Sequence, residues 1–517
     1  MSVQPVASST VVAPTQGPFC LEPRPMTDAA ALEIFNRRFG AFDTAAEGGE
    51  ADGKVSREDL QAVVEHGADQ DLVDAAAHLL EHDALHGALD TAGERGDRDG
   101  LISAKDLTSH IVRSEPGAMP LLDTLQVAGS AGNPTVLQID ADAPEGASWA
   151  NQDGTRAGIV SVYVDGEYVG DATVFAENPG GAEVNLGVLG PGAHTIELRD
   201  STRVGIDADT GIDPASVSAR PRELDIRSSD PVERDQALAA KYAPNLALAD
   251  EHQATNNTPL LTTAQVIHHD DGTTTIAYRI VYSNEDGGDG EDPAMLANRW
   301  GRTTDDERIY EVTIDADGEV IDFSGKNGAG GLELPDDDRG VREMQAARGA
   351  NGLPSLAIAN EHNNVRWDDP ADRHNRAYSG VPVLVAAGPN TGRDASNEPG
   401  PPTNAVMADH PWTWRVANAE MAREGKLDEV APHDRLYFSL DEGVFEGTVE
   451  VEVVLRNGRT ETLELQDVKG SSNSASLVLP FPPGEVASVR IAGVDGADLH
   501  AYYLDDLDTP KPVTTTD

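Results

Sequence analysis

The stretch "AFDTAAEGGEADGKVSREDL", residues 41–60, decides how the N-terminal part of the chain is interpreted. Its second half carries an acid at Asp52, a glycine at Gly53 and a further acid at Asp59. An acid, a turn glycine and an acid at this spacing are typical of positions 5, 6 and 12 of a twelve-residue EF-hand loop. Position 1 of that count falls on Gly48, which has no side-chain oxygen. The loop pattern therefore lacks its first ligand at the usual place.

The same pattern, with the same defect, recurs 47 positions further on in "ALDTAGERGDRDGLISAKDL", residues 88–107. Eleven of the twenty positions are identical, and most of them bear oxygen or form turns. Position 1 is again unsuitable, since it falls on Arg95, and an aspartate again stands five residues upstream (Asp43 and Asp90). A repeated defect indicates one structural unit used twice, each copy with a five-residue insertion.

These two loops predict two Ca²⁺ sites. Calcium takes six to eight oxygen ligands, and lengthening a surface loop costs only about 0.6 kcal/mol per doubling of its length. The first predicted ligand set is Asp43, Glu50, Asp52, the carbonyl of Lys54, Ser56 through water, and Asp59. The second is Asp90, Asp97, Asp99, the carbonyl of Leu101, Ser103 through water, and Asp106. Glu47 and Glu94 are further candidates within the insertions. The alternative is a pair of solvated acidic turns that bind nothing.

The flanks of both loops favour helices. Residues 28–42 and 70–89 carry apolar side chains at helical spacing before each loop. Ser56 and Ser103 each precede an acid by three residues, where a following helix would need a cap. Residues 27–116 are therefore predicted to form an all-α EF-hand pair.

The repeats "FDTAAEGGEADGKVSREDL" and "LDTAGERGDRDGLISAKDL" resemble the calcium-binding repeats of the NolX/HrpF family of type III secreted translocators. The resemblance covers about residues 28–115 and implies bacterial origin, calcium binding through the matched acids, and export. The chain departs from that family downstream, where it has no membrane-inserting segment. Pore formation is therefore not implied.

Composition narrows the function classes. Asp and Glu number 90 against 38 Lys and Arg, which gives a formal charge of −52. Such a field repels nucleic acid and anionic membranes and attracts cations. A single cysteine, Cys20, excludes an intramolecular disulfide framework. No apolar run reaches the 18 residues of a transmembrane helix.

Residues 1–26 are predicted to be a disordered N-terminus. They have no basic segment followed by a long apolar one, as a Sec signal would. The first 21 residues lack charged side chains. This is typical both of an ordinary loose terminus and of a leaderless, type III-like export signal. The expected location is therefore either secreted without a Sec signal or cytoplasmic.

After residue 116 the pattern changes to alternating apolar and polar residues, which is typical of strands. Residues 120–205 are predicted to form an Ig-like β-sandwich with a hairpin turn at Asp165-Gly166. A linker (206–232) and a central α+β domain (233–432) are expected to follow. A second, jelly-roll-like β-sandwich with an Asn457-Gly458 turn is predicted over 433–508, and then a tail (509–517). The predicted fold class is a multidomain chain: N-terminal all-α EF-hand pair, β-sandwich, central α+β domain and C-terminal β-sandwich.

The central region holds the weak candidates for catalysis. His362, His374 and His410 lie near acids there, including Asp369 and Asp409. Histidine and aspartate can serve as metal ligands or as acid–base groups. No metal-hydrolase signature, nucleophile elbow or phosphate loop is present. A packed core with hydrogen-bonded histidines is the alternative.

The sequence also contains a further histidine cluster, and it leaves two classes of function open. His78, His82 and His86 would share one helix face, where two imidazoles can hold zinc. No carboxylate or cysteine completes the set at a clear spacing, so the sequence favours the alternative, a solvated helix face. The first function class is an exported bacterial calcium-binding protein whose sandwiches bind a glycan, a protein or another surface. The second is a calcium-stabilised secreted hydrolase with its centre in 233–432. The sequence leans towards the non-enzymatic class.

Overall fold

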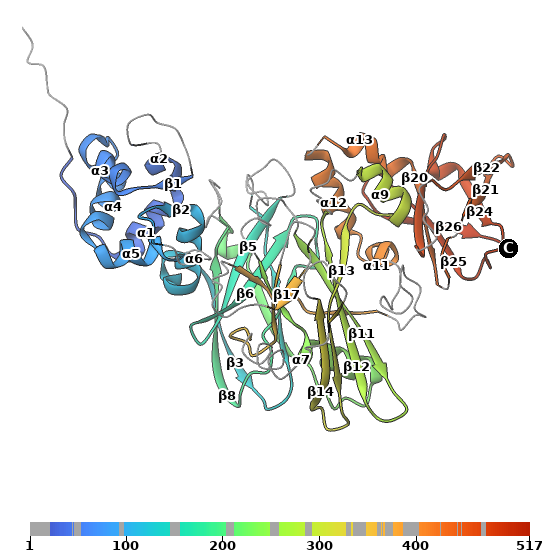
Figure 1. Cartoon of the computed structure of the whole chain (residues 1–517), viewed down its shortest axis with the longest axis horizontal. Helices are drawn as coiled ribbons and strands as arrows, with labels where there is room; N and C mark the ends of the chain where they lie inside the picture. Colours follow the sequence, from blue (N-terminus) through green and yellow to red (C-terminus); the bar gives the residue numbers. More distant parts are fainter. Residues whose placement is uncertain are drawn as a thin grey trace, which may run out of the picture.

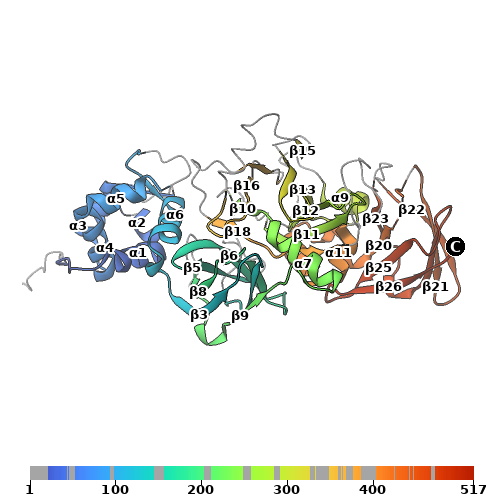
Figure 2. The ribbon, with the colours of Figure 1, turned by 90° about the horizontal axis from the view of Figure 1, so that it is seen from below.

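The computed structural model describes the following residues of the chain: 21–43, 45, 53–92, 98–144, 156–202, 211–248, 258–284, 292–326, 332–333, 348–358, 363, 365–367, 376–385, 403–423, 425–441, 443–445, 447–466 and 472–517. They form three parts in a row. A helical unit lies at one end, a β-rich body in the middle and a further sheet at the C-terminal end (Figure 1). The same order is seen in the perpendicular view (Figure 2).

The N-terminal unit consists of short helices and two very short strands. Its elements are α1 (Asp28–Arg37), α2 (Phe39–Asp43), β1 (Lys54–Val55), α3 (Arg57–His66), α4 (Gln70–Glu81), α5 (Asp83–Asp90), β2 (Ile102–Ser103) and α6 (Ala104–Ser114). Strands β1 and β2 pair antiparallel, with Val55 opposite Ile102. Both side chains are fully buried. The core of the unit also takes in Tyr163 and Tyr168 from the next part of the chain.

The predicted all-α EF-hand pair at 27–116 is wrong. Strands β1 and β2 connect the two loops, and the core extends into the neighbouring sheet. The predicted helix 28–42 breaks at Arg38, where φ is −129°. The predicted helix 70–89 breaks at His82, where φ is −107°. Apolar spacing does not register such breaks, because Arg and His are both tolerated inside helices.

The next strands build one face of the β-rich body. They are β3 (Leu121–Gly129), β4 (Thr135–Asp140), β5 (Ala157–Val164), β6 (Glu167–Phe175), β7 (Ala182–Asn185), β8 (Gly192–Asp200) and β9 (Ser218–Glu223). The predicted β5–β6 hairpin turn at Asp165-Gly166 is confirmed, with φ of 52° and 86°. Strands β7, β4 and β9 form a small sheet whose apolar side chains share a core with β5, β6 and β8.

An eight-stranded sheet crosses the predicted boundary between the first sandwich and the central domain. Its order is β17-β16-β10-β18-β6-β5-β8-β3. The strands from the central region are β10 (Asn245–Leu248), β16 (Ser355–Ile358), β17 (Val365–Trp367) and β18 (Arg376–Tyr378). Strand β18 lies between β10 and β6.

A buried ion pair joins β6 to β18, the two neighbouring strands that come from different predicted domains. A guanidinium N–H of Arg376 donates to Asp171 Oδ2 at 2.8 Å, and Ser161 donates to Asp171 Oδ1 at 2.6 Å. Arg376 is 1% exposed and Asp171 6%. Two segments predicted as separate domains therefore form one sheet.

A six-stranded sheet packs against the eight-stranded one. Its order is β15-β14-β13-β12-β11-β19. The elements are β11 (Pro259–His268), β12 (Thr274–Tyr282), β13 (Asp305–Ile314), β14 (Val320–Lys326), β15 (Leu332–Glu333) and β19 (Val383–Leu384). One core unites side chains of both sheets with helix α7 (Pro231–Tyr242). Tyr278 reaches from β12 to donate to the carbonyl of Ala239 on α7 at 2.9 Å.

The C-terminal sheet follows a group of helices: α9 (Pro293–Trp300), α11 (Thr403–Asp409), α12 (Trp412–Arg423) and α13 (Leu427–Val430). Its order is β22-β21-β24-β26-β25-β20-β23. The strands are β20 (Arg435–Leu440), β21 (Glu450–Leu455), β22 (Thr460–Glu464), β23 (Ser474–Val478), β24 (Val486–Ile491), β25 (Leu499–Leu504) and β26 (Pro510–Thr515). The predicted Asn457-Gly458 turn connects β21 to β22.

The predicted fold class as a whole is wrong, since the described chain is mostly β with several sheets and scattered helices. Strand β9 lies in the predicted linker 206–232, and β26 lies in the predicted tail 509–517. Both missed strands are short and polar, and β9 also pairs with β4, about 80 residues earlier in the chain, so periodicity does not reveal them. Among the described residues no helix has the length and hydropathy needed to cross a membrane.

Candidate functional site

The upstream aspartate of each repeated loop folds back onto the turn glycine. Asp43 is the last residue of α2 and Asp90 the last of α5. The Gly53 N–H donates to Asp43 Oδ2 at 3.0 Å, and the Gly100 N–H donates to Asp90 Oδ1 at 2.9 Å. The two aspartates are 8% and 5% exposed. Both repeats thus hold a buried carboxylate beside the glycine ten residues downstream.

The turn glycines have the conformation that the loop pattern requires. Gly53 has φ of +78° and Gly100 of +82°, a region that other residues rarely adopt. Beside Gly100, Asp99 Oδ1 accepts the N–H of Leu101 at 3.0 Å. Strand β1 begins directly after Gly53 and β2 two residues after Gly100, and the two strands pair with each other. The β1–β2 ladder therefore joins the two loops physically.

The last acid of each loop serves as a helix cap. Asp59 Oδ2 accepts the N–H and the hydroxyl of Ser56 at 2.8 and 2.6 Å, and Ser56 Oγ accepts the Asp59 N–H at 3.2 Å. Ser103 and Asp106 repeat this capping box at 2.8, 2.7 and 3.2 Å. The predicted caps are confirmed. One oxygen of each carboxylate already accepts two hydrogen bonds from the capping serine. Bidentate coordination of an ion would therefore have to displace a cap hydrogen bond.

The two loops differ in their nearest basic side chain. Arg98 Nε lies 3.8 Å from Asp90 Oδ2, and its side chain is 73% exposed. The corresponding position of the first loop is Ala51. A guanidinium beside the Asp90 carboxylate partly offsets the charge that a cation would otherwise neutralise at the second loop.

The remaining predicted ligands lie outside the described residues. These are Glu50, Asp52 and Asp97, together with the insertion candidates Glu47 and Glu94. The described part of the predicted sets is Asp43, Lys54, Ser56 and Asp59 in the first loop, and Asp90, Asp99, Leu101, Ser103 and Asp106 in the second. The calcium assignment therefore stays a prediction. The structure describes the first and the last predicted ligand of each loop.

A cavity of about 230 Å³ lies between the β-rich body and the turn from α11 to α12. Its lining includes Asp171, Glu183, Tyr378, His410 and Trp412. His410 Nδ1 donates to the carbonyl of Val406 at 2.9 Å, so the Nε2 lone pair is the reactive one in the neutral ring.

Of the weak catalytic candidates, only His410 is placed at this cavity by the described residues. Asp409 is exposed and does not line it. His362, His374 and Asp369 lie outside the described residues. A catalytic set centred on these groups stays a prediction.

Sequence reasoning missed Asp28, which completes a group with His78 and His82. Asp28 begins α1, 50 residues before His78, and helical periodicity does not say which helices touch. The only signal in the sequence was the spacing of the two histidines themselves.

No family model matches the chain, and no curated protein matches it. One solved structure found in the comparison is described as "Biofilm associated protein - BSP domain". It is 10% identical to this chain, and the alignment covers 76% of this chain and 63% of that one, with a TM-score of 0.10. This chain thus spans less than two thirds of that structure. A TM-score this low carries no information on fold or function.

Proposed function

We propose that this protein binds two calcium ions through its repeated acidic loops. The observation that supports the proposal is the equivalent placement of Asp43 and Asp90, each buried and hydrogen-bonded to a turn glycine. Solvated turns that bind nothing have no reason to bury the same carboxylate twice, because burial of a carboxylate is costly unless it is compensated.

Calcium is the cation that such loops suit best. The predicted ligands are carboxylates, backbone carbonyls and water, which are hard oxygen donors. Several carboxylates gathered in one loop repel one another, and a divalent ion relieves that repulsion. The capping role of Asp59 and Asp106 limits bidentate coordination. We expect dissociation constants of about 10⁻⁵–10⁻³ M, the weaker part of the range for such loops.

The wider role that we propose is that of an exported bacterial binding protein. Its β-rich body would contact a glycan, a protein or another surface while calcium orders the N-terminal unit. The support is the resemblance of the repeats to secreted translocators and the formal charge of −52, which disfavours nucleic acid as a partner. The alternative hydrolase rests, within the described residues, on His410 alone. We therefore prefer the binding protein.

Calorimetric titration of the full-length chain with Ca²⁺ tests the proposal. The full chain is needed because the core of the N-terminal unit includes Tyr163 from β5. Two equivalents of calcium should bind above a weak background, and Asp43→Ala and Asp90→Ala should each weaken one site by about tenfold or more, since 1.4 kcal/mol is one decade. Asp506→Ala is the matched control, because Asp506 is exposed, carries the same charge and lies far along the chain from both loops.

Asp43→Asn separates charge from loop geometry. The amide oxygen can still accept the Gly53 N–H, so the loop should keep its shape while its ligand charge falls. Calcium affinity of this variant should drop nearly as far as in Asp43→Ala. If Asp43→Ala, Asp90→Ala and Asp43→Asn all titrate like the parent chain, the loops are not calcium sites.

A further inference from the structure

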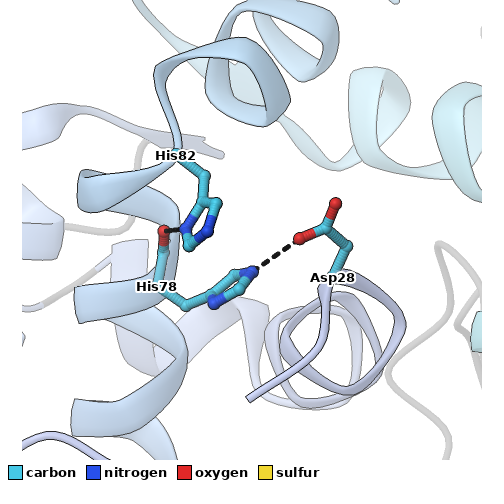
Figure 3. A group of neighbouring side chains, drawn as sticks. All are labelled: Asp28, His78 and His82. Atoms are coloured by element: carbon cyan, nitrogen blue, oxygen red, sulfur yellow. Dashed lines mark hydrogen bonds and ion pairs between the residues drawn. The ribbon is translucent and has the colours of Figure 1, made fainter. Parts of the chain in front are cut away.

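We propose that Asp28, His78 and His82 form a binding site for a divalent transition metal of the zinc class, separate from the two acidic loops. The three side chains converge from two helices (Figure 3). Asp28 begins α1, His78 lies in the last turn of α4, and His82 follows that helix directly. One ligand atom from each residue lies within 4.8 Å of the other two.

The orientation of His82 leaves the correct nitrogen for a metal. Its Nδ1 lies 2.7 Å from the carbonyl oxygen of His78. A carbonyl can only accept, so Nδ1 carries the proton and the lone pair of the neutral ring is on Nε2. Histidines that ligate metals almost always donate their other ring N–H to a carbonyl or carboxylate in this way. His82 is therefore already held as a ligand would be.

His78 and Asp28 supply the other two donors. His78 Nε2 lies 2.7 Å from Asp28 Oδ1, and the rings of His78 and His82 are stacked with centroids 3.9 Å apart. Around zinc, with bonds of about 2.0–2.2 Å and tetrahedral angles, neighbouring donor atoms stand about 3.3 Å apart. Binding would displace the proton between His78 and Asp28. The His78–Asp28 pair would open from 2.7 Å, and donor pairs farther apart, up to 4.8 Å, would close, which side-chain rotation can provide.

Exposure of the site suits an ion that enters from solvent. His78 is 8% exposed, whereas Asp28 and His82 lie on the surface. Three protein ligands and an open face leave a position for water, which is the usual arrangement of open zinc sites. The buried His78 fixes the geometry of the site, and the exposed Asp28 and His82 let the ion enter from solvent.

The donor chemistry distinguishes this site from the acidic loops. Two imidazoles and one carboxylate favour zinc, copper or nickel, whereas calcium prefers oxygen ligands. His110 on α6 interacts electrostatically with Asp28 and could oppose a cation if it were charged. Its Nε2 is buried and has no hydrogen-bond partner in the described part of the chain. Burial lowers the pKa of His110, against the opposing influence of Asp28, and so disfavours a positive charge on this ring.

An occupied site would clamp α1 to the break between α4 and α5. Helix α5 ends at Asp90, so the clamp lies one short helix away from the second acidic loop. The inference does not rest on calcium binding, because none of the three residues belongs to the predicted calcium ligands.

The test is titration of tag-free, full-length protein with Zn²⁺ in millimolar Ca²⁺, which saturates oxygen-rich sites. One equivalent should bind, and His82→Ala should weaken that binding by tenfold or more. His82 is exposed, so its removal leaves the core intact. His66→Ala is the matched control: His66 is a solvent-exposed residue in the last turn of α3 in the same unit, and its loss should change affinity less than twofold.

Asp28→Asn and cobalt spectra complete the experiment. The asparagine keeps a hydrogen-bond acceptor for His78 but removes the charge, so zinc should bind at least several-fold more weakly. Co²⁺ in place of zinc should give visible absorption bands of a low-coordinate site containing nitrogen donors, and these should vanish in His82→Ala. Equal zinc affinity in the parent chain, His82→Ala and Asp28→Asn would overturn the proposal. The cluster would then be two hydrogen bonds, one between His78 and Asp28 and one from His82 to the carbonyl of His78.

Discussion

The helix caps of the unit from α1 to α6 and the buried ion pair of the eight-stranded sheet are contacts of very different range along the chain. In the helical unit, Ser56 and Asp59 are three residues apart and cap α3 between them. In the sheet, Arg376 binds Asp171 across 205 residues of sequence. Short-range contacts leave a signature in the sequence, such as a serine three residues before an acid. Long-range contacts leave none, because each partner by itself is an ordinary polar residue.

The largest effect is expected for Arg376→Met, which removes the long-range ion pair of the sheet. Asp171 would keep its hydrogen bond from Ser161 but lose its only described cationic partner while it stays buried. Removing one member of a buried ion pair typically costs about 3–5 kcal/mol. We expect a loss of that size in the unfolding transition of the β-rich body, measured by denaturant and by hydrogen exchange of β5 and β6 amides.

Arg220→Met is the control for this loss. Arg220 also pairs with an aspartate, Asp140, but its side chain is 69% exposed. Exposed ion pairs contribute about 0–1 kcal/mol, so this variant should unfold almost like the parent chain. Similar losses in the two variants would show that burial of the Arg376 pair is not what joins the two segments.

A smaller effect is expected where the two regions meet. The Tyr163 hydroxyl on β5 donates to the carbonyl of Val112 at 2.6 Å. Val112 lies in the last turn of α6, whose carbonyls have no partner within the helix. Tyr163→Phe leaves this buried acceptor unpaired, at a cost of about 1–3 kcal/mol. Hydrogen exchange should accelerate in α6 and much less in the C-terminal strands; unchanged exchange in α6 would contradict a coupled interface.

The smallest effect concerns pH and the β5–β6 turn. Hydrogen bonding to the carbonyl of Gly190, and then to Asp165, raises the pKa of His194. The N–H of Thr195, and then His194, lower the pKa of Asp165. The raised pKa of His194 gives stability that is complete below the unfolded value of about 6.5 and is lost as pH rises through the folded pKa. The lowered pKa of Asp165 gives stability that is lost only in acid.

We therefore expect the difference in Tm between the parent chain and His194→Gln to be greatest near pH 6 and to shrink by pH 8.5. An NMR titration of the His194 ring should give a midpoint above 6.5. A midpoint at or below 6.5 would show that the ring gains nothing from its two acceptors.

The parts of the fold that could be predicted are those encoded by neighbouring residues. The β5–β6 hairpin follows from alternation and from Asp165-Gly166, whose backbone geometry matches the twist of the flanking strands. The breaks at Arg38 and His82 could not be foreseen, because both residues are compatible with helix. Strand β18 has three residues, too few for any periodicity to register. Its place between β10 and β6 depends on partners far away in sequence.

In the candidate sites, too, some residues could be predicted from the sequence and others could not. The repeat identified Asp43 and Asp90 as equivalent, and their bonds to Gly53 and Gly100 are equivalent as well. The histidines of the proposed zinc site were visible as an i, i+4 pair. Their partner Asp28 was not, since it comes from another helix and only packing brings α1 against α4.

The position of β18 has a consequence for how the chain is made. A ribosome delivers residues at about 5–20 per second. Asp171 is therefore synthesised roughly 10 to 40 seconds before Arg376, which follows it by 205 residues. During that interval β6 exposes an edge with unpaired backbone groups, and the Asp171 carboxylate lacks its guanidinium partner. Open edges of this kind attract other strands. Nascent chains and truncated products that end before residue 376 should therefore be the species that need a chaperone.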